Sequence, residues 1–388
     1  MIGGVFGLLF FVVFITMAQI FCTNCRQPYP AEGFPYRCPK CGGIYDFAAP
    51  PVYDPAQVER SQAGIWRYRH TFGLPAEAEA ISLGEGNTPL LWAEACGRRV
   101  AFKCEFLNPT GSFKDRGSTL LAAWLKRRGV TEAVEDSSGN AGASFAAYAA
   151  RAGMKARVFV PASACGPKRK QIEAYGAELV PVPGARAEAA EAVKKEADSG
   201  AAYASHAYLP FNIPGYATAA YEIVEQLGEM PAAVVLPAGQ GGLLLGLYRG
   251  FEALCAANLI IEEAGAGMKI PRLIGVQARA CAPLWVLFTA GREGLELVAE
   301  NQTLAEGVRV RFPLRGDAVL RSATASGGAF IAVDEEDILP GRDELARRGF
   351  YVEPTSAIVW SALAQTIADL PEPVVVILTG SGYKYEYN

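Results

Sequence analysis

The sequence has 388 residues, a formal net charge of −4, 20% charged residues and 51% hydrophobic residues. This composition excludes a disordered chain, and the length predicts two or three domains with a sizeable core. The small net charge, without a basic stripe, argues against a nucleic-acid partner. Only two histidines are present, His70 and His206, which disfavours a Ser-His-Asp triad or a histidine-rich metal site.

The N-terminal segment, residues 1–20, carries no charged side chain, and the first charge is Arg26. The segment is barely long enough to span a bilayer, and it lacks the basic region and cleavage site of a signal peptide. It is a membrane anchor, an apolar segment packed on the protein, or sequence upstream of a true start at Met17. We favour the start at Met17, because MAQIFCTNC is an ordinary cytosolic beginning, and we expect a cytoplasmic protein without a membrane partner.

Two Cys-x-x-Cys pairs follow, with twelve residues between them: Cys22, Cys25, Cys38 and Cys41. Two such knuckles place four thiolates as a structural Zn2+ requires, and four cysteine ligands leave no open position for catalysis. The sequence therefore predicts a zinc ribbon over residues 21–46, with a ribbon that folds without metal as the alternative. The odd total of nine cysteines argues against a disulfide scaffold and for a reducing compartment.

Residues 47–80 are rich in proline, alanine and aromatic residues, which predicts a linker packed on the main body. Beyond residue 81, apolar runs predict strands at Val100–Lys103, Arg157–Val160, Leu179–Val182, Ala233–Leu236, Leu273–Gln277 and Val374–Leu378. Helices are expected at Ser118–Arg128, Ala141–Ala152, Lys168–Tyr175, Ala187–Ala197, Tyr216–Leu227, Leu243–Cys255 and Ala357–Leu370. Four glycines follow helical runs, where left-handed C-caps are expected: Gly129, Gly153, Gly176 and Gly228. The alternation indicates an α/β fold with parallel sheets, in which ligands bind at the carboxyl ends of strands.

Four loops carry residues suited to chemistry. Lys114 lies at an expected helix start, where the helix dipole lowers the pKa of an amine and favours imine formation. The loop Ser137–Ser144 offers hydroxyls and N–H groups at a helix N-terminus, which suits a carboxylate or a simple helix cap. Three glycines at 239, 241 and 242 follow a strand and predict a phosphate cradle. A fourth loop, Leu378–Gly382, follows the last strand and has hydroxyls that could bond a ring nitrogen of a cofactor, although alone it indicates only a turn.

Together NPTGSFKDRG (108–117), SSGNAGASFAAYAARAG (137–153), GQGG (239–242) and TGSG (379–382) resemble the fold type II family of pyridoxal-5′-phosphate (PLP) enzymes. Within this tryptophan synthase β-like superfamily, they are most similar to threonine synthases. The resemblance covers residues 80–388, and the cysteine ribbon ahead of LGEGNTPL resembles the zinc ribbon of some threonine synthases.

The resemblance implies a role for each motif. Lys114 would carry PLP as a Schiff base and shuttle protons, with Phe113 near the pyridine ring. Asn140 would contact the phenolic oxygen of PLP, and Thr379 would face the pyridine nitrogen. The phosphate would be held by backbone N–H groups of Gly239, Gln240, Gly241, Gly242 and Leu243. The substrate carboxylate would be held by Ser137, Ser138 and Gly139.

The resemblance also implies two three-layer αβα domains with parallel-rich sheets behind the ribbon. The large PLP-binding domain would comprise residues 81–119 and 221–388, and the small substrate-side domain residues 120–220. The implied activity is that of a lyase in threonine biosynthesis, which converts O-phospho-L-homoserine and water to L-threonine and phosphate. A homodimer is expected.

Departures on the substrate side keep other activities open. Ser138 and Ala141 stand where threonine synthases commonly have threonine, and Gln240 stands where they have asparagine. The stretch Thr303–Val308 is similar to serine/threonine dehydratases. A serine/threonine ammonia-lyase, a cysteine or cysteate synthase-like β-replacement enzyme, or a protein that has lost catalysis is therefore the alternative. The candidates for a second anion site, which would bind a phosphorylated substrate, are Lys168, Arg169 and Lys170. A solvated basic helix face explains these three residues equally well.

Overall fold

The computed structural model describes residues 20–258, 269–298 and 300–386. Residues 1–19, which form nearly all of the hydrophobic N-terminal segment, lie outside the described part. Among the described residues, no helix combines the length and the apolar character needed to cross a bilayer.

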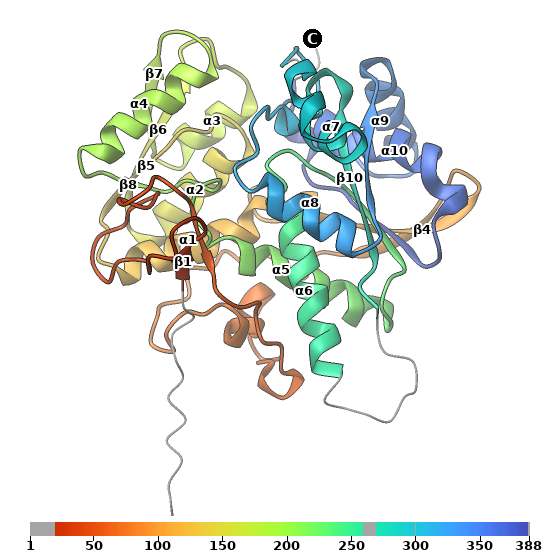
Figure 1. Ribbon diagram of the computed structural model, residues 1–388, viewed down its shortest axis with the longest axis horizontal. Coiled ribbons are helices and arrows are strands. Elements are labelled where there is room, and N and C mark those ends of the chain that lie inside the picture. The colour runs from red at the N-terminus through yellow and green to blue at the C-terminus, as the bar shows by residue number, and fades with distance from the viewer. Residues whose placement is uncertain (1–19, 259–268, 299, 387–388) are drawn as a thin grey trace, which may run out of the picture.

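The larger of two main sheets has six strands (Figure 1). Its order is β11 (Ala329–Val333), β10 (Arg272–Ala278), β9 (Ala233–Pro237), β12 (Val374–Ile377), β4 (Arg98–Lys103) and β3 (Leu90–Ala95). Every neighbouring pair is parallel except β3 and β4, which are antiparallel at one edge. Because the central strands β9 and β12 are covered on both faces, they read as continuous apolar runs.

The smaller sheet has four parallel strands, in the order β7 (Glu178–Val182), β6 (Lys155–Pro161), β5 (Glu132–Glu135) and β8 (Ala202–Tyr203). The first helices of the chain are α1 (Lys114–Arg127), α2 (Asn140–Ala152), α3 (Pro167–Ala174) and α4 (Arg186–Asp198). Figure 1 shows the smaller sheet and its helices on one side of the molecule and the larger sheet on the other.

The remaining helices cover the larger sheet: α5 (Ile213–Leu227), α6 (Gly242–Asn258), α7 (Pro283–Ala290), α8 (Gly316–Ala325), α9 (Ile338–Arg347) and α10 (Pro354–Thr366). Alternate residues of β9 face opposite layers. Val234 and Leu236 pack in a core with Leu244 of α6, whereas Val235 packs in a second core with Ile358 of α10. The period-two alternation of a strand thus places helices on both faces of this sheet, which makes it a three-layer structure.

The cysteine ribbon is a short antiparallel pair, β1 (Ile20–Cys22) and β2 (Tyr45–Phe47). It is held to the body by polar and aromatic contacts. Asp46 accepts hydrogen bonds from Arg249 of α6 at 2.9 and 2.8 Å, and Tyr36 stacks edge-on against Tyr203 and Tyr208. After the ribbon, the segment 47–80 contains two 3₁₀ helices, η1 (Pro55–Gln57) and η2 (Gly64–Thr71).

Most sequence predictions of elements are confirmed, with shifted ends. All six expected strands form, and the four expected C-cap glycines adopt positive φ values between 71° and 80°. The helix expected to begin at Ser118 begins at Lys114, and the helix expected to end at Leu370 ends at Thr366. The strands β3, β5, β8 and β11 were not among those expected; β5, for example, has only the four residues Glu132–Glu135, too few to show a period.

Candidate active site

Lys114 is the first residue of α1, so its amine lies at the positive end of a helix. Its Nζ lies 4.8 Å from the centre of the Phe113 ring. Phe113 is itself fixed, because its backbone N–H donates to the carbonyl of Thr379 at 3.0 Å and its ring lies 5.3 Å from that of Tyr216. The loop after the last strand and the start of α5 therefore both hold Phe113, the residue directly before the lysine.

The two residues after Lys114 have buried side chains that connect the start of α1 to other segments. Asp115 accepts hydrogen bonds from the Thr110 N–H and hydroxyl at 2.7 and 2.6 Å and from the Ser144 hydroxyl at 2.6 Å. Arg116 is fully buried and forms ion pairs with Glu105 at 2.7 Å and Glu222 at 2.6 Å. Since each partner comes from a different segment, these two residues fix the angle at which α1 begins.

Gly117 also belongs to the motif for a steric reason. A Cβ atom at this position would lie 2.6 Å from the Asn212 side chain and 2.7 Å from the Tyr216 ring. Only glycine lets α1 approach the start of α5 this closely.

The environment of Lys114 makes its amine a usable base. Burial lowers the pKa of Lys114 to about 8, while the nearby negative charge of Glu135 raises it and Arg186 lowers it. An amine with such a pKa is partly neutral near physiological pH, which imine formation and proton transfer both require.

The loops after two strands, β12 and β5, each supply a buried polar atom that has no hydrogen-bond partner among the described residues. The hydroxyl Oγ1 of Thr379, after β12, is buried and has no hydrogen-bond partner among the described residues. Asn140 begins α2, and its Nδ2 donates to Glu353 Oε1 at 2.6 Å while its Oδ1 is buried without a hydrogen-bond partner in the described structure. An unpaired buried hydroxyl is costly unless a ligand satisfies it, so Thr379 fits a ring nitrogen that accepts its hydrogen bond.

The glycine loop between β9 and α6 has the geometry of an anion cradle. Gly241 has φ +78°, and a Cβ there would lie 2.5 Å from the Val319 side chain. The helix begins at Gly242, so the N–H groups of its first turn have no intrahelical partner. The Gln240 side chain points elsewhere, since its Oε1 accepts from the Leu314 N–H at 3.0 Å. Backbone N–H groups, and not the Gln240 amide, are therefore what this loop offers to a phosphate.

The loop between β5 and α2 differs in one respect from the sequence expectation. The Ser137 N–H donates to a carboxylate oxygen of Glu135, and the Ser137 hydroxyl accepts from the Gly139 N–H at 3.2 Å. These two groups of Ser137 already have partners inside the protein. The Ser137 hydroxyl still has its own O–H to donate, so Ser137, Ser138 and the first turn of α2 all have hydrogen-bond donors that suit a substrate carboxylate.

Two side chains of this region were not predicted as site residues. Glu135 is 1% exposed, and its Oε1 lies 2.9 Å from Nδ1 of His206. The sequence signals were the acidic pair Glu135-Asp136 directly before the Ser-Ser-Gly-Asn loop and the rarity of histidine. A third, Glu353, is 2% exposed and holds Asn140.

Of the three basic residues considered for a second anion site, only Lys168 reaches the site. Its Nζ pairs with Glu353 Oε2 at 2.7 Å, across from the smaller sheet to the larger one. Arg169 contacts Glu173 of its own helix, and Lys170 is 76% exposed. Because Glu353 already neutralises Lys168, this helix does not present a free cation to a substrate phosphate.

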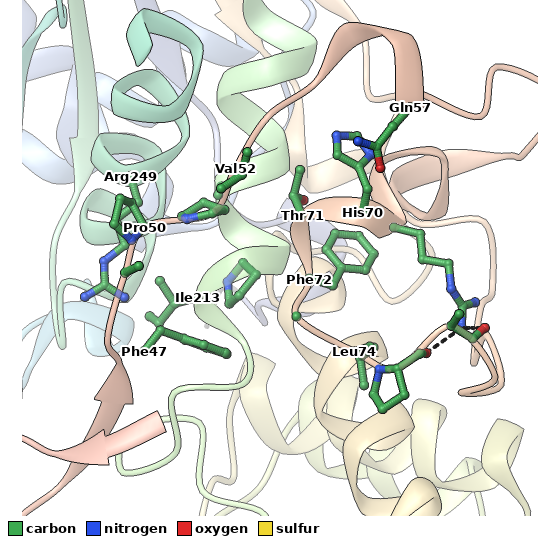
Figure 2. A pocket seen from close by; sticks show the side chains of 18 of the residues that line it. Phe47, Pro50, Val52, Gln57, His70, Thr71, Phe72, Leu74, Ile213 and Arg249 are labelled. Atoms are coloured by element: carbon green, nitrogen blue, oxygen red, sulfur yellow. Dashed lines mark hydrogen bonds between the residues drawn. The ribbon is translucent and has the colours of Figure 1, made fainter. Parts of the chain in front are cut away.

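A cavity of about 1170 Å³ lies elsewhere in the protein (Figure 2). It lies between the 47–80 segment and the start of α5, with Phe72, His70 and Arg249 in its walls. Neither Lys114 nor the loops at 137–140 and 239–243 line it. A second hollow of about 660 Å³ is lined by Asn108–Gly111 and the Ser381–Lys384 segment, on the outer side of the lysine loop.

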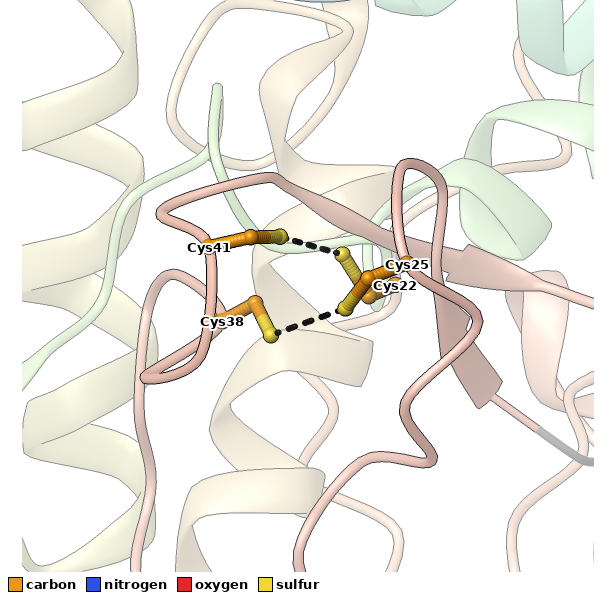
Figure 3. Close-up of side chains that lie close together, drawn as sticks. All are labelled: Cys22, Cys25, Cys38 and Cys41. Carbon is orange, nitrogen blue, oxygen red and sulfur yellow. Dashed lines mark hydrogen bonds between the residues drawn. The ribbon is translucent and has the colours of Figure 1, made fainter.

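The four ribbon cysteines converge as the sequence predicts (Figure 3). All four Sγ atoms lie within 4.8 Å of one another, with Cys22 to Cys41 at 3.5 Å and Cys25 to Cys38 at 3.6 Å. A tetrahedral zinc with Zn–S bonds of 2.3 Å requires sulfur–sulfur separations of about 3.8 Å. The donor set and its spacing therefore fit Zn2+.

The fold and this site together define an α/β enzyme that holds PLP at the carboxyl ends of its strands. A lysine of lowered pKa, an anion cradle and an unpaired hydroxyl lie on three loops that follow or precede buried strands. That set matches the three functional groups of PLP: its aldehyde, its phosphate and its pyridine nitrogen.

Comparison with known proteins also identifies a PLP-dependent enzyme. The family model "Pyridoxal-phosphate dependent enzyme" matches residues 81–380, so the chain belongs to that family. A threonine synthase of Methanocaldococcus jannaschii is 32% identical over 385 residues, which cover 94% of this chain and 92% of that protein. A threonine synthase of Synechocystis sp. is 33% identical over 87% of both chains.

Among solved structures, the threonine deaminase of T.th. is similar, with a TM-score of 0.59 and 30% identity over 77% of this chain and 94% of that one. The chain is thus a fold type II PLP-dependent enzyme of the lyase kind that acts on a small amino acid.

Proposed function

We propose that this enzyme is a threonine synthase, which converts O-phospho-L-homoserine and water to L-threonine and phosphate. The observation that carries the proposal is the similarity to threonine synthases over nearly the whole chain. The lysine loop, the cradle and the Thr379 hydroxyl supply what such a reaction needs from the protein around PLP.

The proposal gives each of the proposed site residues a role in binding or catalysis. PLP, when bound to Lys114, supplies stabilisation of negative charge at the substrate carbon atoms. The amine of Lys114 takes and returns the proton at the substrate Cα, for which its lowered pKa suits it. Ser138 and the N-terminus of α2 orient the substrate carboxylate, and the first turn of α6 holds the cofactor phosphate.

The neutral hydroxyl of Thr379 would donate to the pyridine nitrogen without placing a charge beside it. Asn140 has one N–H of its amide on Glu353 and a second N–H left for the phenolic oxygen of PLP. Phe113, fixed by Thr379 and Tyr216, would border the pyridine ring.

To test the proposal directly, purified holoenzyme is incubated with O-phospho-L-homoserine, and the amounts of inorganic phosphate and threonine released are measured in the same sample. We expect equal amounts of both products. If Lys114 binds PLP but neither product forms, the substrate assignment is wrong while the cofactor assignment remains.

A second candidate, the deamination of serine or threonine, has one specific observation in its favour. The loop similar to dehydratases packs beside the site, where the Gly307 N–H donates to Thr355 Oγ1 at 3.0 Å and a Cβ on Gly239 would lie 2.8 Å from the Gly307 carbonyl. Lys168 is moreover neutralised by Glu353, which removes one cation that a phosphorylated substrate could use. Release of ammonia and a 2-oxo acid from L-threonine, without activity on O-phospho-L-homoserine, would favour this candidate.

We further propose that Cys22, Cys25, Cys38 and Cys41 hold one structural Zn2+. Metal analysis of protein purified without chelator should find about one zinc per chain, and Cys38→Ser should lose it, because three thiolates and a hydroxyl bind zinc far more weakly. The surface variant Cys165→Ser is the matched control, since Cys165 is exposed and outside the ribbon. Retention of a full zinc equivalent in Cys38→Ser would contradict the assignment.

The cytoplasmic location and the homodimer that the resemblance implies also remain proposals. Four thiolates placed for a metal suit a reducing compartment. Sedimentation of the holoenzyme at several concentrations tests the dimer.

A further inference from the structure

Asp46, in strand β2 of the cysteine ribbon, contacts arginines from two different parts of the larger domain. Its carboxylate accepts hydrogen bonds from Arg249 of α6 at 2.9 and 2.8 Å. The oxygen Oδ2 of the same carboxylate also lies 3.3 Å from Nη1 of Arg315. One carboxylate, whose side chain is 14% exposed, is therefore the ion-pair partner of two guanidinium groups.

Arg315 fastens the start of α8 to the ribbon. It directly precedes α8 and is buried. Its Nη2 donates to the carbonyls of Tyr45 and Tyr208, each at 2.9 Å. Its Nη1 has no hydrogen-bond partner among the described residues, so the contact of Nη1 with Asp46 is an attraction of charges. Since a buried guanidinium group needs a negative partner, the carboxylate of Asp46 stabilises the position of α8.

The two helices that Asp46 joins are also the two that shape the glycine loop. The helix α6 begins in this loop and carries Arg249 further along. From the side of α8, the Leu314 N–H donates to Gln240 Oε1 at 3.0 Å, and a Cβ on Gly241 would lie 2.5 Å from the Val319 side chain. The helices α6 and α8 pack side by side (Figure 1). Their separation therefore sets the space that the loop occupies.

The two arginines would repel one another without the carboxylate between them. Both guanidinium groups contact Oδ2 of Asp46, Arg249 at 2.8 Å and Arg315 at 3.3 Å. Like charges this close interact strongly where water is largely excluded. Because the arginines belong to α6 and to the start of α8, their repulsion would act directly on the separation of these helices.

We propose that Asp46 is a positioning residue for the phosphate cradle: its carboxylate neutralises Arg249 and Arg315 together and so holds α6 and α8 at the separation at which the glycine loop binds the cofactor phosphate. The ribbon then contributes to cofactor binding through two helices. Loss of the Gln240 contact alone matters little, because Val319 still packs against the loop. The inference rests on the proposed role of the glycine loop.

The competing explanation is that Asp46 only fastens the ribbon to the body. The two explanations differ in their consequences for PLP and for pyridoxal, which lacks the phosphate group. A cradle of altered shape weakens the binding of the phosphate, whereas a loosened ribbon affects the two aldehydes alike. The quantity to measure is therefore the phosphate preference, which is the Kd of pyridoxal divided by the Kd of PLP.

The experiment titrates cofactor-free protein with PLP and, separately, with pyridoxal, and follows binding by visible absorbance. The hemiacetal that free pyridoxal forms lowers its affinity by the same factor for every variant, so it cancels when variants are compared. In Asp46→Asn the affinity for PLP should fall about tenfold and that for pyridoxal by less than about twofold. The phosphate preference should then fall about fivefold to tenfold.

Three further variants separate charge from attachment. The double variant Asp46→Asn, Arg249→Met removes the repulsion and should regain most of the phosphate preference. Arg37→Ala breaks the exposed ion pair that ties the ribbon to Asp198 of α4 at 2.8 Å, and it should leave the preference unchanged. If Asp46→Asn does not fold, Arg315→Gln detaches α8 from the same carboxylate without leaving an unpaired cation, and the same fall is expected.

Equal losses for PLP and pyridoxal, or no loss, in the folded Asp46 variant overturn the inference and leave Asp46 as a fastening of the ribbon. A double variant that regains nothing overturns it as well, because charge repulsion is then not the cause. A wild-type protein that does not bind PLP, or does not prefer it to pyridoxal, refutes the proposed function and its cradle, and this outcome is distinct from the other two.

Discussion

Two strand–helix turns, from β9 to α6 and from β5 to α2, have the same local geometry but carry different chemical groups. The turn from β9 to α6 contains three glycines and no charged side chain, and it offers backbone N–H groups to a phosphate. The turn from β5 to α2 begins with Glu135 and Asp136, whose carboxylates bind an N–H group, an imidazole and a tyrosine. The proposed cofactor side thus offers backbone groups, whereas the proposed substrate side carries charged side chains.

The two turns also differ in how far their binding groups depend on neighbouring side chains. Backbone N–H groups bind a phosphate whatever the neighbouring side chains are, provided that glycine permits the turn. Side-chain carboxylates in a buried site must instead be matched by partners chosen one by one. Glu135 and Lys168 each have such a partner, His206 and Glu353.

The strongest test of the cofactor side is Lys114→Ala. Without the amine, PLP cannot be bound covalently and the substrate proton has no base, so turnover should fall about a thousandfold or more. Absorbance and product formation measure both effects. Lys126→Ala, on the same helix and paired with exposed Glu79 at 2.9 Å, should behave as wild type; equal losses in both variants would contradict the assignment.

On the substrate side, Lys168→Ala should lower the free energy of unfolding by about 2 kcal/mol, because it leaves the buried carboxylate of Glu353 without its cation. Denaturant unfolding of the two proteins measures this difference. Lys170→Ala, on the same helix with an exposed partner 3.5 Å away, should change it by less than about 0.5 kcal/mol. Similar values for both variants would show that the pair across the two sheets contributes little.

A smaller effect is expected from Thr379→Val, which replaces the unpaired hydroxyl by a methyl group of the same shape. PLP affinity should fall about tenfold, since one hydrogen bond to the ring nitrogen is lost. The thermal midpoint of the cofactor-free protein should not fall, because the hydroxyl has no protein partner among the described residues. Thr366→Val, whose hydroxyl bonds the Ala362 carbonyl at 2.8 Å, should leave PLP affinity unchanged.

The smallest effect belongs to Gln240→Asn. Because the Gln240 side chain accepts from Leu314 and the backbone forms the cradle, PLP affinity should change by less than about twofold. Gly241→Ala is the contrasting variant: φ is +78° there and a Cβ would meet Val319 at 2.5 Å, so affinity should fall clearly. A large loss in Gln240→Asn would show that the amide takes part in phosphate binding.

Much of the site could be predicted because its motifs are local. The residues from Asn108 to Gly117 form one turn and one helix start, so their order along the chain already sets their arrangement in space. The cysteine pairs were predictable for the same reason, since each Cys-x-x-Cys knuckle fixes two ligands within a single turn. The glycine C-caps likewise depend only on adjacent residues.

The sequence by itself therefore determined the fold class and the cysteine cluster, and it supplied the proposals for the cofactor lysine and the cradle. The tertiary structure alone decided which charged groups face one another: Glu135 with His206, 71 positions apart, and Lys168 with Glu353. The tertiary structure also decided that the Gln240 side chain binds the Leu314 N–H. Backbone geometry is set by neighbours along the chain, whereas the charge and pKa of a buried side chain are set by neighbours that only the folded sheets bring together.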